Sequence, residues 1–174
     1  LDTEDFVKKA RLLKGYFDAY NVTDNQRAIM RLSPVICSLL LLQEGLEPIM
    51  QLTCRDRNRL AIQSELLGAQ AIGVKNILSL TGDYINIGDH PQAKPVFDLD
   101  SIQLLRLIQK LNNGKNDNGF ELNSRCSFFP GAALNPNAQP RELVIDVMKR
   151  KIESGAKFFQ TQVIVQIDCF KEFC

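Results

Sequence analysis

Three residues that could take part in chemistry stand together at the end of an apolar stretch in NILSLTGD, residues 76–83. The apolar residues are typical of a buried strand, whereas Thr81, Gly82 and Asp83 supply a hydroxyl, a backbone without a side chain and a carboxylate. Because a charge is costly inside an apolar core, Asp83 indicates that this strand ends at a polar site. The alternative is a solvated loop aspartate that caps the following turn.

Polar or small residues also end the other predicted strands, at Thr23-Asp24-Asn25, Thr53-Cys54-Arg55-Asp56, Ala132-Ala133-Leu134-Asn135 and Thr161-Gln162. The strongest charged cluster is RDRN, residues 55–58, between a predicted strand and a helix. We expect Arg55 and Asp56 to form an internal ion pair rather than to act as an acid and a base. His90 is the only histidine, so histidine triads and multi-histidine metal sites are excluded and no metal site is predicted.

Helices and strands that alternate along the chain must position these residues. Helical spacing of apolar residues predicts helices over about 4–17, 34–42, 57–72, 100–112 and 140–154. Apolar runs predict strands over 19–24, 47–54, 76–80, 127–135 and 157–165. Asp2 and Thr3 are candidate caps of the first helix, and Ser33-Pro34 begins the second, which stops at Gly45. Strands separated by helices favour right-handed βαβ units in a parallel sheet, so the predicted fold class is α/β.

The polar strand ends favour a (β/α)8 TIM barrel over an open doubly wound sheet. In a barrel the carboxyl ends of all strands meet at one mouth, whereas a doubly wound sheet has its site at one switch point. Neither GxGxxG nor GxxxxGK(S/T) occurs in the sequence, which weakens the common nucleotide-binding alternatives. Five strands do not close a barrel that usually takes about 250 residues. We therefore expect residues 1–174 to form a single partial TIM-barrel domain of about five βα units.

Composition narrows the class of protein. The 174 residues are 45% hydrophobic and 24% charged, as in an ordinary globular domain. The 21 basic and 20 acidic side chains nearly balance, and no basic stretch is interleaved with aromatic residues, so no nucleic-acid partner is indicated. The longest apolar run, Val35–Leu42, is far shorter than the roughly 20 residues of a membrane span, and the sequence favours a cytoplasmic protein.

The five cysteines lack a CxxC pair, so we expect reduced thiols, with Cys37 packed as a small apolar residue on a helix.

Six motifs follow one another along nearly the whole chain: NVTDN, LTCRDRNR, QSELLGAQAIGVKNILSLTGD, GDHPQAKPVFDLDS, GAALNP and KRKIESGAKFFQTQ. Together they resemble the methylenetetrahydrofolate reductase family, particularly its clostridial and acetogen-type members. The resemblance implies a (β/α)8 barrel that holds a flavin, FAD or FMN, across its strand ends. It implies an oxidoreductase of one-carbon metabolism that reduces 5,10-methylenetetrahydrofolate to 5-methyltetrahydrofolate, with NAD(P)H or an iron–sulfur partner protein as the electron donor.

The resemblance also implies roles for individual residues. Asp83 is similar to the family's aspartate between flavin and pterin, which acts in catalysis and folate binding, and Gln162 to a glutamine that reads the pterin by hydrogen bonding. The implied flavin contacts are Thr23, Gln51, Thr81, Gly82, Asp83, Ala132, Lys151 and Ala156. Many relatives have histidine where this chain has Gln51, which can hydrogen-bond a flavin but cannot be protonated. Gly82 would let a flat ring approach the backbone closely.

Alternatives stay open at several positions and for the function as a whole. Ala132 and Ala156 equally fit the close packing of small residues, Lys151 fits a solvated helix lysine, and Gln162 fits a partner of the backbone. The family's catalytic acid is a glutamate of its first strand, which the match places outside this chain, so we expect the 174 residues alone to be inactive. A pterin-binding barrel of the methyltransferase type, and a noncatalytic or truncated subunit that acts through a partner, are the two other functions. The sequence does not decide between a hetero-oligomer and a homo-oligomer.

Overall fold

A computed structural model describes residues 2–164 and 167–173, without the side chains of residues 169 and 172. The elements of this part of the chain are α1 (Thr3–Leu12), β1 (Tyr20–Val22), η1 (Gln26–Ala28), α2 (Pro34–Gln43), β2 (Pro48–Thr53), α3 (Arg59–Ala71), β3 (Asn76–Leu80), η2 (Ile85–Ile87), α4 (Ser101–Asn112), β4 (Phe129–Leu134), α5 (Arg141–Glu153), β5 (Phe158–Thr161) and α6 (Ile167–Phe173). The elements η1 and η2 are short 3-10 helices in the loops after β1 and β3.

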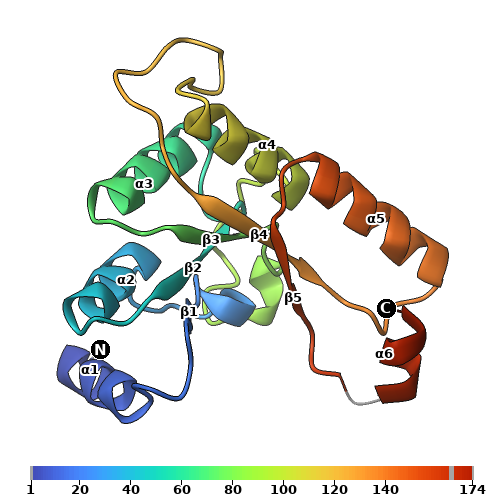
Figure 1. The fold of residues 1–174 in the computed structure, drawn as a ribbon, viewed down its shortest axis with the longest axis horizontal. Coiled ribbons are helices and arrows are strands. Elements are labelled where there is room, and N and C mark those ends of the chain that lie inside the picture. The colour runs from blue at the N-terminus through green and yellow to red at the C-terminus, as the bar shows by residue number, and fades with distance from the viewer. Residues whose placement is uncertain (1, 165–166, 174) are drawn as a thin grey trace.

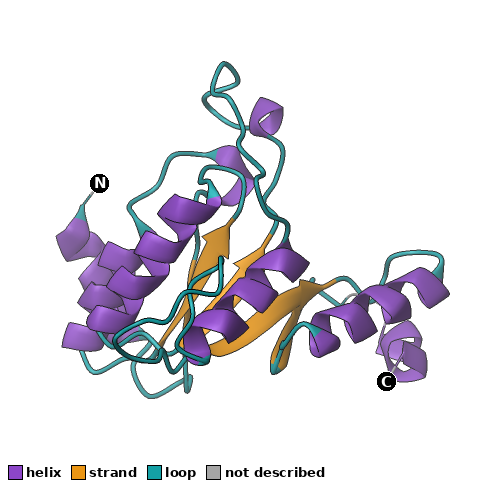
Figure 2. Cartoon of the chain, turned by 90° about the horizontal axis from the view of Figure 1, so that it is seen from above, coloured by secondary structure: helices purple, strands orange, loops and turns teal. Residues whose placement is uncertain are grey.

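The strands of the described residues form one five-stranded parallel sheet in the order β1-β2-β3-β4-β5. Figure 1 shows the sheet curled into a half-barrel, with α2, α3, α4 and α5 along its outer side. Figure 2, seen from above, shows helices lying along the strands of the sheet. Each strand pairs with the next along the chain, which is the order of a (β/α)8 barrel. The predicted α/β class, the parallel sheet and the partial barrel are therefore confirmed.

Apolar residues on the outer face of the sheet form the main core with the helices. Met50, Leu52 and Ile77 are fully buried there. They belong to one cluster with side chains of α3 and α4, which include Ile62, Leu66, Leu104, Leu107 and Ile108. Gln51 and Leu78 pair across β2 and β3 and, because side chains alternate between the faces of a strand, point to the inner face. Because the residues of one face pack against the helices, the alternate residues of each strand lie on the concave side of the half-barrel.

Hydrogen bonds and proline fix where several helices begin. Asp2 accepts hydrogen bonds from two backbone N–H groups of the first turn of α1, so its prediction as the cap is confirmed. Asp100 and Gln103 form a capping box at the start of α4. Pro34 is the first residue of α2, as predicted, but Ser33 forms no side-chain hydrogen bond as its cap. In the described part of the chain, no helix is long and apolar enough to cross a membrane.

Two predicted boundaries are wrong. The helix predicted over 4–17 ends at Leu12, because the chain turns at Gly15 with a φ of 88°, and Phe17 is then 60% exposed. The strand predicted over 157–165 ends at Thr161, which pairs with the last residue of β4, Leu134. Position 165 of that prediction lies outside the described residues. The sequence patterns do not predict α6.

Three cysteines of the described residues are buried and free. Cys37 packs in the small apolar cluster between α2 and β1, as predicted. Burial raises the pKa of the thiols of Cys37, Cys54 and Cys126, that of Cys54 to about 12. The side chains of Cys169 and Cys174 lie outside the part of the chain that the structure describes.

Candidate active site

A cavity of about 430 Å³ lies at the carboxyl ends of the strands, between residues that end or follow β1 to β5. Five residues that the sequence predicts as site residues line it together: Gln51, Thr81, Gly82, Asp83 and Gln162. Gln51 lies on β2, whereas the other four lie in the segments that directly follow β3 and β5. The parallel order of the sheet brings them to one mouth, as expected of a barrel.

The floor of the cavity is apolar, and amide side chains stand on either side of it. Leu78 and Leu80 of β3 and Ala133 of β4 line the cavity between Gln51 on β2 and Gln160 on β5. Ala133 pairs directly with Gln160 across β4 and β5. This arrangement suits a flat ring, because leucine and alanine side chains contact the ring face while amides donate and accept hydrogen bonds at its edge.

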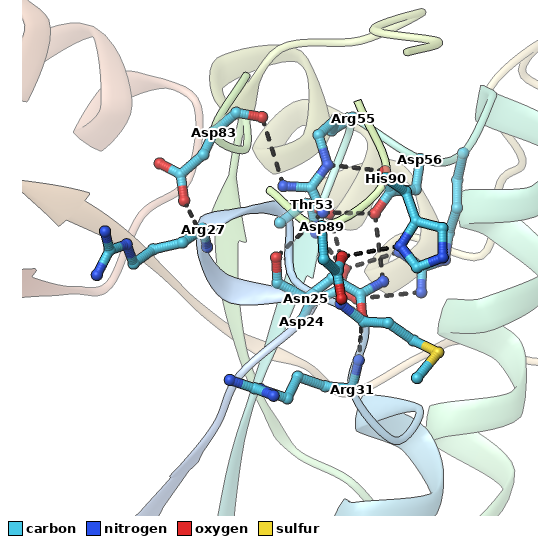
Figure 3. Close-up of polar contacts among 12 residues, drawn as sticks. Asp24, Asn25, Arg27, Arg31, Thr53, Arg55, Asp56, Asp83, Asp89 and His90 are labelled. Carbon is cyan, nitrogen blue, oxygen red and sulfur yellow. Dashed lines mark hydrogen bonds and ion pairs between the residues drawn. The ribbon is translucent and has the colours of Figure 1, made fainter. Parts of the chain in front are cut away.

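Arg55, which lines the cavity, is the central side chain of a polar network (Figure 3). It is 1% exposed and forms a bidentate ion pair with Asp56. Nε of Arg55 donates to Oδ1 of Asp56 at 2.7 Å, and Nη2 donates to Oδ2 at 2.6 Å. The same guanidinium donates to the backbone oxygens of Asn25, at 3.2 Å, and Asp83, at 3.4 Å. The predicted internal ion pair is therefore confirmed. Arg55 also ties the loops after β1 and β3 to the end of β2.

The pKa shifts of this pair favour its charged form. The hydrogen bonds that Arg55 donates to the carboxylate of Asp56 raise the pKa of Arg55. Burial raises the pKa of Asp56, but the hydrogen bond and charge of Arg55 outweigh burial, and the pKa of Asp56 lies below its usual value. A pair that stays ionised at neutral pH holds structure and exchanges no proton.

A second ion pair joins Arg57 to Asp24. The side chain of Asp24 is fully buried and accepts hydrogen bonds from the backbone N–H and the hydroxyl of Thr53, at 2.8 and 2.9 Å, and from Arg57, at 2.7 Å. Burial lowers the pKa of Arg57, but Asp24 outweighs burial and the net shift is upward. Asp24 therefore joins the end of β1 to the end of β2 and has a structural role.

Asp83 is held by the loop that follows β1. The backbone N–H of Arg27 donates to its Oδ2 at 2.9 Å, and within the described residues its Oδ1 has no partner in the protein. Asn25, Arg27 and Ala28 all have a positive φ, between 45° and 58°, which residues other than glycine rarely adopt. Gly88 packs against this loop so closely that a Cβ there would lie 1.9 Å from the carbonyl oxygen of Ala28. The loop after β3 thus supports the loop that positions Asp83.

Gly82 and Thr81 have structural contacts as well as a place in the cavity. Gly82 has a φ of 101°, and a Cβ there would lie 2.9 Å from the Cβ of Arg55 and 3.3 Å from that of Thr53. The chain therefore needs glycine at this position, whether or not a ring approaches it. The hydroxyl of Thr81 accepts a hydrogen bond of 3.1 Å from the backbone N–H of Ser101, at the start of α4.

Four other predicted site residues lie outside this cavity. Thr23 lines a separate, mainly apolar cavity between β1 and α2. Ala132 and Ala156 are buried behind the sheet in one small cluster. Lys151 lies in a groove between α5 and β4, where its Nζ donates to the backbone oxygen of Ala133 at 2.7 Å and burial lowers its pKa. Ala133 lines both this groove and the main cavity, so the bond from Lys151 reaches the wall between them.

The sequence patterns miss three polar residues of the cavity, Gln26, Arg27 and Gln160. Gln160 stands two positions before Gln162 in the same extended segment, so the two-residue period of a strand could have placed both on one face. No pattern in the sequence signals the left-handed conformation of Arg27, because arginine rarely adopts it without support from tertiary contacts.

Comparisons with known proteins give the chain a family. The family model for methylenetetrahydrofolate reductase matches residues 3–174. The 5,10-methylenetetrahydrofolate reductase of Buchnera aphidicola subsp. Baizongia pistaciae (strain Bp) is 26% identical over 167 residues, which cover 96% of this chain and 51% of that protein. A probable methylenetetrahydrofolate reductase (NADPH) of Caenorhabditis elegans is 23% identical over 129 residues, which cover 74% of this chain and 18% of that protein.

The chain thus spans about half the length of the bacterial relative and a smaller share of the animal one. The family match nevertheless extends over nearly the whole chain, and it agrees with the partial barrel and with the order of the motifs. The resemblance inferred from the motifs is confirmed: this chain belongs to the methylenetetrahydrofolate reductase family.

Proposed function

We propose that the chain is part of a flavin-dependent enzyme of one-carbon metabolism that reduces 5,10-methylenetetrahydrofolate to 5-methyltetrahydrofolate. The observation that carries the proposal is the cavity at the strand ends, where amide side chains and Asp83 surround an apolar floor in a member of this family. A pterin and a flavin are both flat rings with alternating hydrogen-bond donors and acceptors at their edges. The cavity offers both the apolar face and the polar edge that such rings need.

The residues of the cavity fit a flavin. Within the described residues, the side chains of Gln51, Gln160 and Gln162 form no hydrogen bond with the protein, so all three amides are available to a ligand. An amide both donates and accepts hydrogen bonds and therefore matches the carbonyl and N–H groups of a flavin ring. When bound, the flavin, FAD or FMN, would supply the hydride.

Asp83 and Gln162 would act on the folate. The bond from Arg27 fixes one oxygen of Asp83 and leaves the other to accept a hydrogen bond from a bound pterin. Gln162 lies at the exposed end of β5, where its amide can donate to and accept from the pterin edge. The negative charge of Asp83 would favour positive charge that develops on the folate during reduction.

The other predicted contacts belong to the same proposal. Thr81 and Gly82 would border the flavin at the end of β3. Lys151 would meet a phosphate or ribityl group that extends beyond the cavity along the groove between α5 and β4. Thr23, Ala132 and Ala156 would support the flavin from positions around or behind the strand ends. The electron donor would be NAD(P)H or an iron–sulfur partner protein.

Purified full-length protein tests the proposal. We expect a flavin absorbance spectrum, release of FAD or FMN on denaturation, and formation of 5-methyltetrahydrofolate with NAD(P)H or a reduced iron–sulfur protein. Folate binding without a flavin would favour the methyltransferase-type barrel instead. A protein that binds neither flavin nor folate, or that needs a second subunit for turnover, would favour the noncatalytic subunit.

A further inference from the structure

Gln160 lies on the inner face of β5, one residue before the carboxyl end of the strand. Its neighbour Phe159 packs behind the sheet with Ala132 and Ala156, so alternation along the strand turns Gln160 to the opposite, concave side. Gln160 pairs with Ala133 and lines the cavity together with Gln162, two residues further along the chain.

The amide of Gln160 has no hydrogen-bond partner within the described residues, and its oxygen is buried although the side chain as a whole is half-buried. Its Oε1 is shielded from solvent and has no hydrogen bond within the described residues. Its Nε2 forms no hydrogen bond with those residues either. The hydroxyl of Ser38 on α2 is the one other side-chain atom of the described residues in this condition, and Ser38 does not line the cavity. Buried polar groups are nearly always paired, so an unpaired amide at a cavity wall indicates a partner that comes from the ligand.

We propose that Gln160 determines specificity by pairing with the lactam edge of the bound ring, where a ring N–H lies next to a carbonyl. Its Oε1 accepts a hydrogen bond from the ring N–H, and its Nε2 donates to the adjacent carbonyl oxygen. A flavin and a pterin both carry such an edge, so either ring satisfies the amide. The inference rests on the proposed function, because it assigns one more residue to the same cavity.

The proposal makes two predictions of opposite sign for one substitution. In the free protein, Gln160→Met removes an unpaired buried amide oxygen and keeps the length of the side chain, so the melting temperature should rise. In the complex, the same change removes two hydrogen bonds to the ring, so the affinity should fall by about tenfold or more. A residue with a purely structural role would change stability and leave the affinity unchanged.

The matched control is Ser38→Ala. It removes the other unpaired buried polar atom, on a helix away from the cavity, and should raise the melting temperature without any change in affinity. Gln160→Glu serves as a second test, because the carboxylate keeps an acceptor and the shape but places an oxygen opposite the ring carbonyl. We expect Gln160→Glu to bind the ring at least as weakly as Gln160→Met.

The experiment uses full-length protein and two ligands. Flavin affinity is measured by fluorescence quenching on protein freed of flavin, and 5-methyltetrahydrofolate affinity is measured on flavin-loaded protein. Weaker flavin binding by Gln160→Met assigns the amide to the flavin, and weaker folate binding alone assigns it to the pterin. Wild-type affinity of both Gln160 variants for both ligands overturns the inference and leaves the proposed function standing. If the wild-type protein binds neither ligand, the proposed function and this inference both fail.

Discussion

The backbone N–H of Arg27 donates a 2.9 Å hydrogen bond to Oδ2 of Asp83, across 56 positions of the chain (Figure 3). This bond joins the loop after β1 to the loop after β3. Arg55, two residues after the end of β2, donates to the backbone oxygens of both loops. The carboxylate of Asp83 is therefore positioned by the ends of three strands together.

Asp83→Asn tests the role of the carboxylate charge. The amide keeps the shape of the side chain and can still accept the hydrogen bond from Arg27, so we expect the melting temperature to change little. Loss of the charge should slow folate reduction by about ten- to hundredfold. Turnover is measured in full-length protein at limiting and at saturating folate. Turnover equal to wild type at both concentrations would show that Asp83 is only a loop cap.

Gly88→Ala tests whether the loop after β1 positions Asp83. The added Cβ would overlap the carbonyl of Ala28, so the loop must shift and the bond from Arg27 to Asp83 should be lost. We expect a loss of about 1 to 3 kcal/mol in the free energy of unfolding, with weaker folate binding.

The control for Gly88 is Gly68→Ala on α3. Gly68 is exposed and a Cβ there meets no atom within 4 Å, so the substitution should stabilise the helix by about 0.5 to 1 kcal/mol and leave folate affinity unchanged. Denaturant unfolding and folate titration of both variants provide the comparison. If Gly88→Ala binds folate as the wild type does, the loop has no part in the site.

Gln162→Ala should weaken folate binding more than flavin binding. The substitution removes the amide after β5 that we propose to pair with the pterin, and it leaves the rest of the cavity in place. One lost hydrogen bond corresponds to about 1 to 3 kcal/mol of binding free energy. Affinities for both ligands are measured on the same preparation, so the flavin serves as the internal control. Equal affinity for folate in a normally folded variant would remove Gln162 from the binding site.

The thiol of Cys54 should resist alkylation in the folded protein. Burial raises its pKa from 9.0 to about 12, so at pH 8 the thiol is almost wholly protonated as well as inaccessible. Since the pKa is higher in the folded state, the contribution of Cys54 to stability is complete below pH 9 and is lost as the pH rises toward 12. Mass spectrometry after iodoacetamide treatment with and without urea measures the reaction. Equal labelling in both conditions would contradict the burial of Cys54.

Residues 1–174 expressed alone should be inactive in folate reduction and poorly soluble. In the described sheet, β1 and β5 are edge strands with one unpaired side each, and Phe129 on the inner face is 49% exposed. Full-length protein assayed in parallel provides the comparison. A soluble monomer of residues 1–174 with full turnover would show that the half-barrel needs no further strands.

The sequence by itself determined the sequential order of the sheet and the position of its polar ends. Short apolar runs such as Ile77 to Leu80, bounded by glycine and charge, specify buried parallel strands because few other structures bury such runs between helices. The pairing of Arg55 with Asp56 was equally predictable, since a charged cluster at the end of a buried strand must neutralise itself. The family motifs added the expected roles of Asp83 and Gln162.

Only the tertiary structure decided which strand-end residues share one cavity. Thr23 and Gln51 are both polar residues of strand segments, yet Thr23 lines a different cavity and Gln160 joins Gln51, because the inner face depends on which side of each strand the helices cover. The left-handed backbone that turns the N–H of Arg27 toward Asp83 likewise depends on packing against Gly88, 61 positions away in the chain. Contacts between distant loops depend on how the sheet and its helices pack, so a local sequence pattern does not predict them.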